Sequence, residues 1–110
     1  MTDHTAQHPV ELGPVGQEIM LENDKVRIWH ITLAPGETQP LHHHGLAYVV
    51  VAVQGAQNVI HTAAGERIDV KEETGAVVFR EPGQTHMLTN AGDTTYIGRI
   101  VELKTGPAAP

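Results

Sequence analysis

Glycine and proline interrupt this chain at short and regular intervals, and no other feature restricts its possible folds as strongly. The segments between these breaks are rich in Val, Ile and Thr, which favour extended strands. No segment carries a sustained helical period of hydrophobic residues. The pattern predicts about eight strands at spacings of about ten residues. They occupy residues 26–33, 41–43, 46–54, 58–62, 66–70, 76–79, 85–89 and 94–103.

Strands of this number and spacing indicate an all-β domain, built either as a sandwich or as a small barrel. A barrel is the sharper prediction, because its interior can hold one ligand. The chain has 110 residues, which favours one domain, and its 40% hydrophobic and 18% charged residues are ordinary for a globular protein. We expect an N-terminal arm over residues 1–17, the barrel over 18–104 and a flexible tail over 105–110.

Composition argues against several classes of function. Lys and Arg number 7 against 13 Asp and Glu, a formal net charge of −6, and the basic residues are scattered, so we expect no nucleic-acid partner. The longest apolar run, residues 47–53, is far shorter than the ~20 residues that span a bilayer, and the start lacks the pattern of a signal peptide. We therefore expect a soluble cytoplasmic protein with no membrane partner. The absence of Cys excludes disulfides, thiolate metal sites and cysteine nucleophiles.

One predicted strand is apolar on both of its faces. Residues 48–53 read YVVVAV, as expected for a strand that is covered on both sides of its sheet. If the even-numbered positions face the barrel interior, then Val49, Val51 and Val53 face outward and need a cover. A second copy of the chain would supply it, which makes this a candidate homodimer surface. A terminal arm or a helix over the same face is the alternative.

Histidine is unusually abundant, since the eight His residues outnumber Lys and Arg together. Residues two apart on a strand project from the same face, so His42 and His44 can converge while His43 points away. An imidazole from another strand, such as His86, could complete a metal-binding face. The remaining histidines have ordinary explanations as solvated or hydrogen-bonded side chains: His4, His8, His30 and His61.

The spacing around the paired histidines resembles the first cupin motif. That motif reads Gly, five residues, His-x-His, three or four residues, Glu, six residues, Gly. Here Gly36 is followed at the matching spacings by His42, His44, Tyr48 and Gly55. The resemblance extends over the whole motif, with Tyr48 in the place of Glu.

The spacing around His86 resembles the second cupin motif. Gly75 is followed by five residues, Glu81-Pro82-Gly83, two residues, His86, three residues and Asn90. Together the two motifs cover about half of the chain. The resemblance to a small single-domain cupin implies a double-stranded β-helix, a jelly-roll-like barrel. It also implies that one divalent transition metal is held by His42, His44 and His86.

The replacement of the usual carboxylate by Tyr48 changes the expected charge of the site. A phenol has a pKa of ~10 and is normally neutral, so three neutral imidazoles would leave a divalent ion with a charge near +2. Such a site favours a small anionic substrate. We expect Tyr48 to shape the pocket and to offer its hydroxyl to substrate as a catalytic and binding group, with direct ligation as the alternative. Arg99 could pair with a substrate carboxylate if it turns inward, and a surface position is the alternative.

Three-His cupins of this kind resemble the diketone-cleaving dioxygenases, which use ferrous iron and molecular oxygen. This resemblance implies an oxidoreductase that oxidises or cleaves a small anionic carbonyl compound, with Fe(II) as the favoured metal. The ligands also suit Zn, Ni, Mn or Cu, so a non-oxidative isomerase, lyase or hydrolase is a second hypothesis. A third is a small-molecule-binding protein without turnover.

Overall fold

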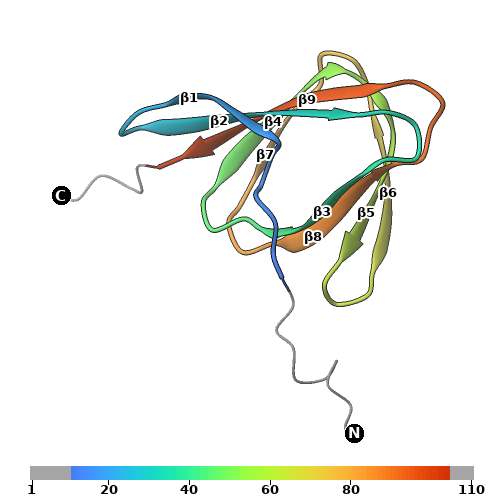
Figure 1. The fold of residues 1–110 in the computed structure, drawn as a ribbon, viewed down its shortest axis with the longest axis horizontal. Helices are drawn as coiled ribbons and strands as arrows, with labels where there is room; N and C mark the ends of the chain where they lie inside the picture. The colour runs from blue at the N-terminus through green and yellow to red at the C-terminus, as the bar shows by residue number, and fades with distance from the viewer. Residues whose placement is uncertain (1–10, 105–110) are drawn as a thin grey trace, which may run out of the picture.

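The structure is a computed structural model that describes residues 11–104 (Figure 1). Residues 1–10 of the predicted arm and the predicted tail, 105–110, lie outside the described residues. Within the described range the chain forms nine strands and no helix. None of the described residues therefore belongs to a helix that could cross a membrane. The cytoplasmic location expected from the sequence stays a prediction.

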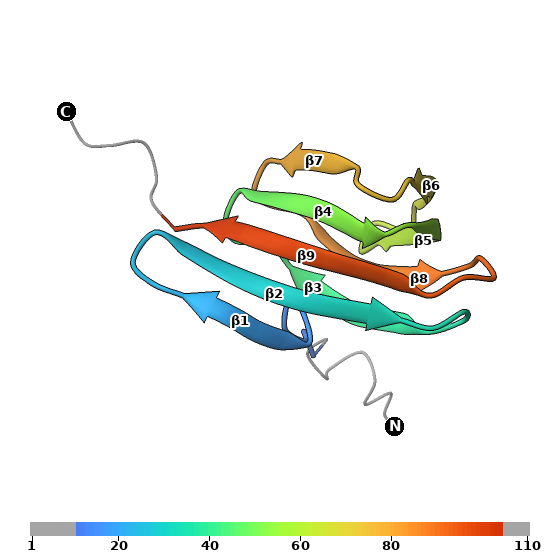
Figure 2. The same cartoon turned by 90° about the horizontal axis from the view of Figure 1, so that it is seen from above.

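The strands form two antiparallel sheets that enclose a common interior (Figures 1 and 2). The five-stranded sheet has the order β1-β2-β9-β4-β7, and the four-stranded sheet has the order β3-β8-β5-β6. In chain order the strands are β1 (Glu18–Glu22), β2 (Val26–Leu33), β3 (Thr38–His43), β4 (Tyr48–Gln54), β5 (Ala56–Thr62), β6 (Arg67–Glu72), β7 (Val77–Arg80), β8 (Thr85–Asn90) and β9 (Tyr96–Leu103).

All eight strands expected from the sequence are present, and their ends differ from the prediction by at most three residues. The structure adds β1, which the sequence pattern does not predict. All five of its residues are exposed, and a strand without a buried face carries no alternation of apolar and polar residues. β1 pairs with β2 at the edge of the five-stranded sheet, with a register shift between Ile19 and Leu21.

The core lies between the two sheets and is filled by alternate residues of the strands. On β4 the buried residues are Tyr48 and Ala52, and on β9 Tyr96 and Ile100 are buried in the same way. The even-numbered positions of β4 therefore face inward, as the sequence predicts. The full core cluster consists of Val15, Ile31, Leu33, Tyr48, Ala52, Ala56, Tyr96 and Ile100.

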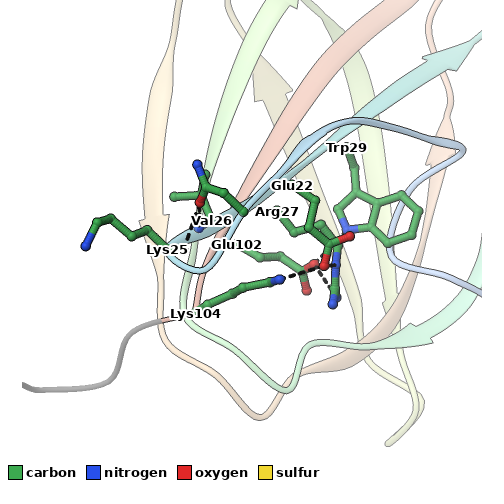
Figure 3. Close-up of polar contacts among 8 residues, drawn as sticks. Glu22, Lys25, Val26, Arg27, Trp29, Glu102 and Lys104 are labelled. Carbon is green, nitrogen blue, oxygen red and sulfur yellow. Dashed lines mark hydrogen bonds and ion pairs between the residues drawn. The ribbon is translucent and has the colours of Figure 1, made fainter.

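A buried carboxylate holds together one end of the five-stranded sheet (Figure 3). Glu102 accepts hydrogen bonds from the indole Nε1 of Trp29 at 2.6 Å and from Nη1 of Arg27 at 3.2 Å. Glu22 pairs with Arg27 at 3.1 Å and with Lys104 at 2.6 Å, and these hydrogen bonds lower the pKa of Glu22. The network joins β1, β2 and β9 to Lys104, which directly follows β9.

The loops at the ends of β3 and β8 are fastened to each other. The backbone N–H of His44 donates to the carbonyl of Gln84 at 2.8 Å, and that of Gly83 donates to the carbonyl of His44 at 2.7 Å. Gly83 has a φ of 109°, a conformation that side chains with a Cβ rarely adopt. In the adjoining ladder His42 lies directly opposite His86. These contacts place both histidine-bearing segments at one end of the barrel.

Candidate metal centre

Three histidines from two neighbouring strands meet inside the barrel. His42 lies on β3, His44 follows that strand directly, and His86 lies on β8 opposite His42. All three are buried, and each offers a nitrogen atom that lies within 4.8 Å of the others. His43 is exposed, and its Nδ1 lies 2.7 Å from the Thr85 hydroxyl. The structure thus brings together the histidines that the sequence singled out, and it leaves His43 outside.

The orientation of the rings directs nitrogen lone pairs toward one point. Nδ1 of His42 lies 2.7 Å from the carbonyl oxygen of Pro40. A carbonyl only accepts, so Nδ1 carries the proton and Nε2 keeps its lone pair. Nε2 of His44 and Nε2 of His86 are 3.2 Å apart. The ring planes cross at steep angles, between 69° and 82°, so the three rings surround a common point rather than stack.

This geometry fits a bound transition-metal ion. Two nitrogen ligands at about 2.1 Å from one ion lie about 3.0 to 3.4 Å apart for the usual coordination angles. The separation of 3.2 Å between the Nε2 atoms of His44 and His86 falls in that range. Among the described residues the group contains only imidazoles, with no carboxylate ligand. Neutral nitrogen donors suit iron, zinc, nickel and copper better than they suit magnesium or calcium.

Burial keeps these imidazoles in the neutral form that binds metals. Desolvation, followed by the effects of the neighbouring His42 and His86, lowers the pKa of His44 from 6.5 to about 3. Desolvation, followed by the effect of His42, lowers the pKa of His86 to about 4. Burial also lowers the pKa of His42, although the hydrogen bond to Pro40 opposes this shift. At neutral pH no proton has to leave these ligands before an ion binds.

Tyr48 lies beside the histidines and holds one of them in place. Its ring stacks on His44 with centroids 3.8 Å apart and planes inclined by 13°. Nδ1 of His44 is buried without a hydrogen-bond partner among the described residues, so stacking on Tyr48 helps to orient this ring. The Tyr48 hydroxyl donates to Oε1 of Gln84 at 2.7 Å, and burial raises the pKa of Tyr48 to about 12. The phenol is therefore neutral, and its proton points to Gln84.

The histidines form one end of a largely apolar cavity that is lined by residues of both sheets. At the opposite end Glu72 accepts hydrogen bonds from Tyr96 at 3.0 Å and from Asn58 at 2.6 Å. Between the two ends Gln39 and Lys71 also line the cavity, but most of the wall consists of aliphatic side chains: Ile31, Val50, Ile60, Val70, Ala76, Val78, Leu88 and Ile100. An apolar wall excludes water and strengthens electrostatic interactions at the histidine end.

Arg99, which the sequence suggested as a substrate-binding residue, is not near this cavity. Inward positions on β9 are even-numbered, so Arg99 lies on the outer face of the sheet. There its Nη1 lies 2.8 Å from Nδ1 of His30, on the neighbouring strand β2. The structure therefore places Arg99 at the surface position that was its alternative.

Two polar residues near the histidines were missed by the sequence analysis. Arg80 lines the cavity on β7 and lies opposite Tyr48 in the β4–β7 ladder. Gln84 accepts the Tyr48 hydrogen bond from the loop before β8. Alternation along residues 76–80 could have indicated Arg80, because it shares a face with Ala76 and Val78. The predicted strand ended one residue too early for this to be seen.

Comparisons with known proteins identify the fold. No protein-family profile and no curated protein sequence matches the chain. Among solved structures, a cupin domain from Bordetella pertussis is 22% identical over 88% of this chain and 100% of its own, with a TM-score of 0.76. An RmlC-like cupin with a double-stranded β-helix fold from Methanocaldococcus jannaschii is 20% identical over 78% of this chain and 76% of its own, with a TM-score of 0.66.

A characterised enzyme also appears among the similar structures. The polyketide cyclase RemF from Streptomyces resistomycificus is 17% identical, with a TM-score of 0.57, over 78% of this chain and 59% of its own. Identities at this level establish the fold and not the activity. The prediction of an all-β cupin barrel is confirmed: the chain has the cupin double-stranded β-helix fold, with three buried histidines able to bind a metal at one end of its cavity.

Proposed function

We propose that this protein is a metal-dependent enzyme that oxidises or cleaves a small anionic carbonyl compound, such as a β-diketone. His42, His44 and His86 would hold one divalent ion, with Fe(II) favoured. The observation that carries the proposal is the convergence of these buried imidazoles without a carboxylate among them. This donor set resembles that of the diketone-cleaving dioxygenases.

Bound Fe(II) would supply Lewis acidity and the electrons for reaction with molecular oxygen. The chain supplies the surroundings for that chemistry. Its neutral imidazoles leave the positive charge of the ion uncompensated, which favours an enolate or a carboxylate over a neutral molecule. The aliphatic wall keeps water away from the bound compound. Tyr48 orients His44 by stacking, and its hydroxyl oxygen can accept a hydrogen bond from substrate while its proton is held by Gln84.

A second candidate is a non-oxidative reaction with zinc, nickel or manganese in the same place. Two observations favour it: the fold is shared with the polyketide cyclase RemF, and the long aliphatic wall suits a partly apolar substrate. In this case the ion would polarise a carbonyl group.

Single replacement of His42, His44 or His86 by Ala is expected to lower metal affinity more than about 100-fold, beyond the 10–100-fold typical of outer-shell partners. Each replacement removes one of three nitrogen ligands. The matched control is His43→Ala, which should bind metal like the wild type because His43 faces outward. Elemental analysis after dialysis against a weak chelator measures the difference. Equal losses in all four variants would contradict the assignment.

Stability of the metal-free protein should fall as the pH drops from about 6.5 toward 4. In the unfolded chain these imidazoles protonate near the ordinary pKa of 6.5, whereas burial holds the pKa of His44 at about 3 and that of His86 at about 4. The unfolded state then binds more protons, and each such group contributes a slope of about 1.4 kcal/mol per pH unit.

Urea unfolding of chelator-treated protein at several pH values measures this slope. His86→Asn should unfold with a shallower pH dependence, and His43→Ala should keep the wild-type dependence. A free energy of unfolding that does not change between about pH 6.5 and pH 4.5 would show that the histidines are not held neutral in the folded state.

Protein loaded with Fe(II) is expected to consume oxygen in the presence of pentane-2,4-dione or a related diketone. An oxygen electrode and product analysis measure the reaction, and His86→Ala treated with the same amount of iron is the inactive control. Tyr48→Phe keeps the ring stack and should retain iron while turnover slows, because only the hydroxyl is lost. If no metal-loaded sample consumes oxygen, but the zinc-loaded protein converts the diketone anaerobically, the second candidate replaces the first.

A further inference from the structure

Beside the three histidines lies a cationic side chain that has no counterion among residues 11–104. Arg80 is half-buried on β7 and lines both the barrel cavity and an open depression on the outside of the molecule. Among the described residues its guanidinium forms no ion pair and no hydrogen bond with another side chain. By contrast, Arg27 pairs with Glu22 and Glu102, and Arg67 pairs with Asp69.

The position of Arg80 connects it to the histidines. It lies opposite Tyr48, which stacks on His44, and it shares both the cavity lining and the outer depression with His86. Its positive charge contributes to the lowered pKa of His44 and of His86. The carboxylates that line the two spaces, Glu72 and Glu66, form no ion pair with it in the described part of the chain. The side chain is therefore free to receive an anion from the ligand.

From this placement we infer that Arg80 binds a carboxylate of the substrate, while a second oxygen-bearing group of the same molecule lies at the three histidines. The inference rests on the proposed function and narrows its substrate class to a carbonyl compound that also carries a carboxylate. A guanidinium presents paired N–H donors that match the two carboxylate oxygens, and partial burial at the mouth of an apolar cavity strengthens the ion pair. The rest of the substrate would lie against the aliphatic wall.

Two related compounds test the role of Arg80. Pentane-2,4-dione and 2,4-dioxopentanoate share the diketone group, but only the second carries a carboxylate. Titration calorimetry with zinc-loaded protein should show that the carboxylated compound binds at least tenfold more tightly to the wild type. Arg80→Gln should abolish this preference without changing zinc content or the affinity for pentane-2,4-dione, and Arg80→Lys should restore part of it. The control Arg67→Gln removes an exposed arginine and should have no effect.

Equal affinities of the wild type for both compounds would overturn the inference, as would an equal loss for both compounds in Arg80→Gln. This result is separable from the fate of the proposed reaction. An Arg80-dependent preference without oxygen consumption would reject the oxidation and leave the carboxylate site standing. Oxygen consumption without such a preference would support the oxidation and reject the carboxylate site at Arg80.

The outer face of the five-stranded sheet carries a second, independent inference. One apolar residue from each strand forms a continuous row across it, through the pairs Leu21↔Ile28, Ile28↔Val101, Val101↔Val49 and Val49↔Phe79. Paired residues project from the same face of a sheet. The neighbouring row on the same face consists of Glu18, His30, Arg99, Val51 and Val77. The charged or titratable groups of the two rows are therefore all in this second row.

Nothing in the described part of the chain covers this face. Phe79 is 54% exposed and Val77 is 63% exposed. The described end of the N-terminal segment runs elsewhere, since Gly13 donates to the carbonyl of Leu41 on β3. Within residues 11–104 neither a helix nor an arm lies over this face.

We propose that a second copy of this chain covers the face, which makes the protein a homodimer. The strands β1, β2, β9, β4 and β7 contain 5, 8, 8, 7 and 4 residues. At about 3.3 Å per residue and about 4.8 Å between strands they give a planar face on the order of 500 Å², and side-chain relief increases its accessible area. This approaches the roughly 800 Å² per partner of a standard interface. An identical partner presents the same apolar row, so each copy removes the other's apolar surface from water.

Sedimentation velocity at micromolar concentrations tests the homodimer. The wild type should sediment as a dimer, and Val49→Lys and Val77→Lys should each shift it to monomer by placing a charge in the interface. The matched control is Ile68→Lys, since Ile68 is 45% exposed on an edge strand of the other sheet and should leave the dimer intact. Circular dichroism checks that each variant is folded. A monomeric wild type, or folded lysine variants that remain dimeric, would overturn the proposal.

Discussion

The register between β3 and β8 is the constraint on which the candidate metal centre depends. Because His42 lies directly opposite His86, the two imidazoles project from one face of the four-stranded sheet into the barrel. His44 is the first residue after β3, and backbone hydrogen bonds with Gly83 and Gln84 hold it in position. A slip of one residue along β3 would turn His42 outward and His43 inward, and the cluster of nitrogen atoms would be lost.

One end of the barrel interior is neutral to positive in charge, whereas the chain as a whole is negative. The sequence carries a net charge of −6, yet the histidine end of the cavity contains neutral imidazoles, a neutral phenol and the guanidinium of Arg80. The carboxylate of Glu72 lies at the opposite end, where Tyr96 and Asn58 occupy its oxygen atoms. Separation of these groups by aliphatic walls makes one end of the cavity receptive to anions, even though the protein is acidic.

The five-stranded sheet carries apolar residues on both faces, and its faces have different roles. The inner face of β4 and β9 supplies Tyr48, Ala52 and Ile100 to the core. The outer face carries the apolar row of the proposed homodimer. In that homodimer the alternation along β4 would serve two interfaces at once, which would account for the lack of polar positions in residues 48–53. At the end of the same sheet, the buried carboxylate of Glu102 fastens β2 and β9 together away from the cavity.

The sequence alone determined the class of fold, the positions of eight strands and the sharing of one face by His42 and His44. These features depend on local periodicity and turn residues, which are visible in any short window of the chain. Tertiary structure decided the rest. It put His86 opposite His42, turned Arg99 to the surface, placed Arg80 beside the histidines and added the exposed strand β1. Periodicity shows which residues of one strand share a face, but only packing and pairing between distant segments select the face that becomes the interior and the residues that meet across it.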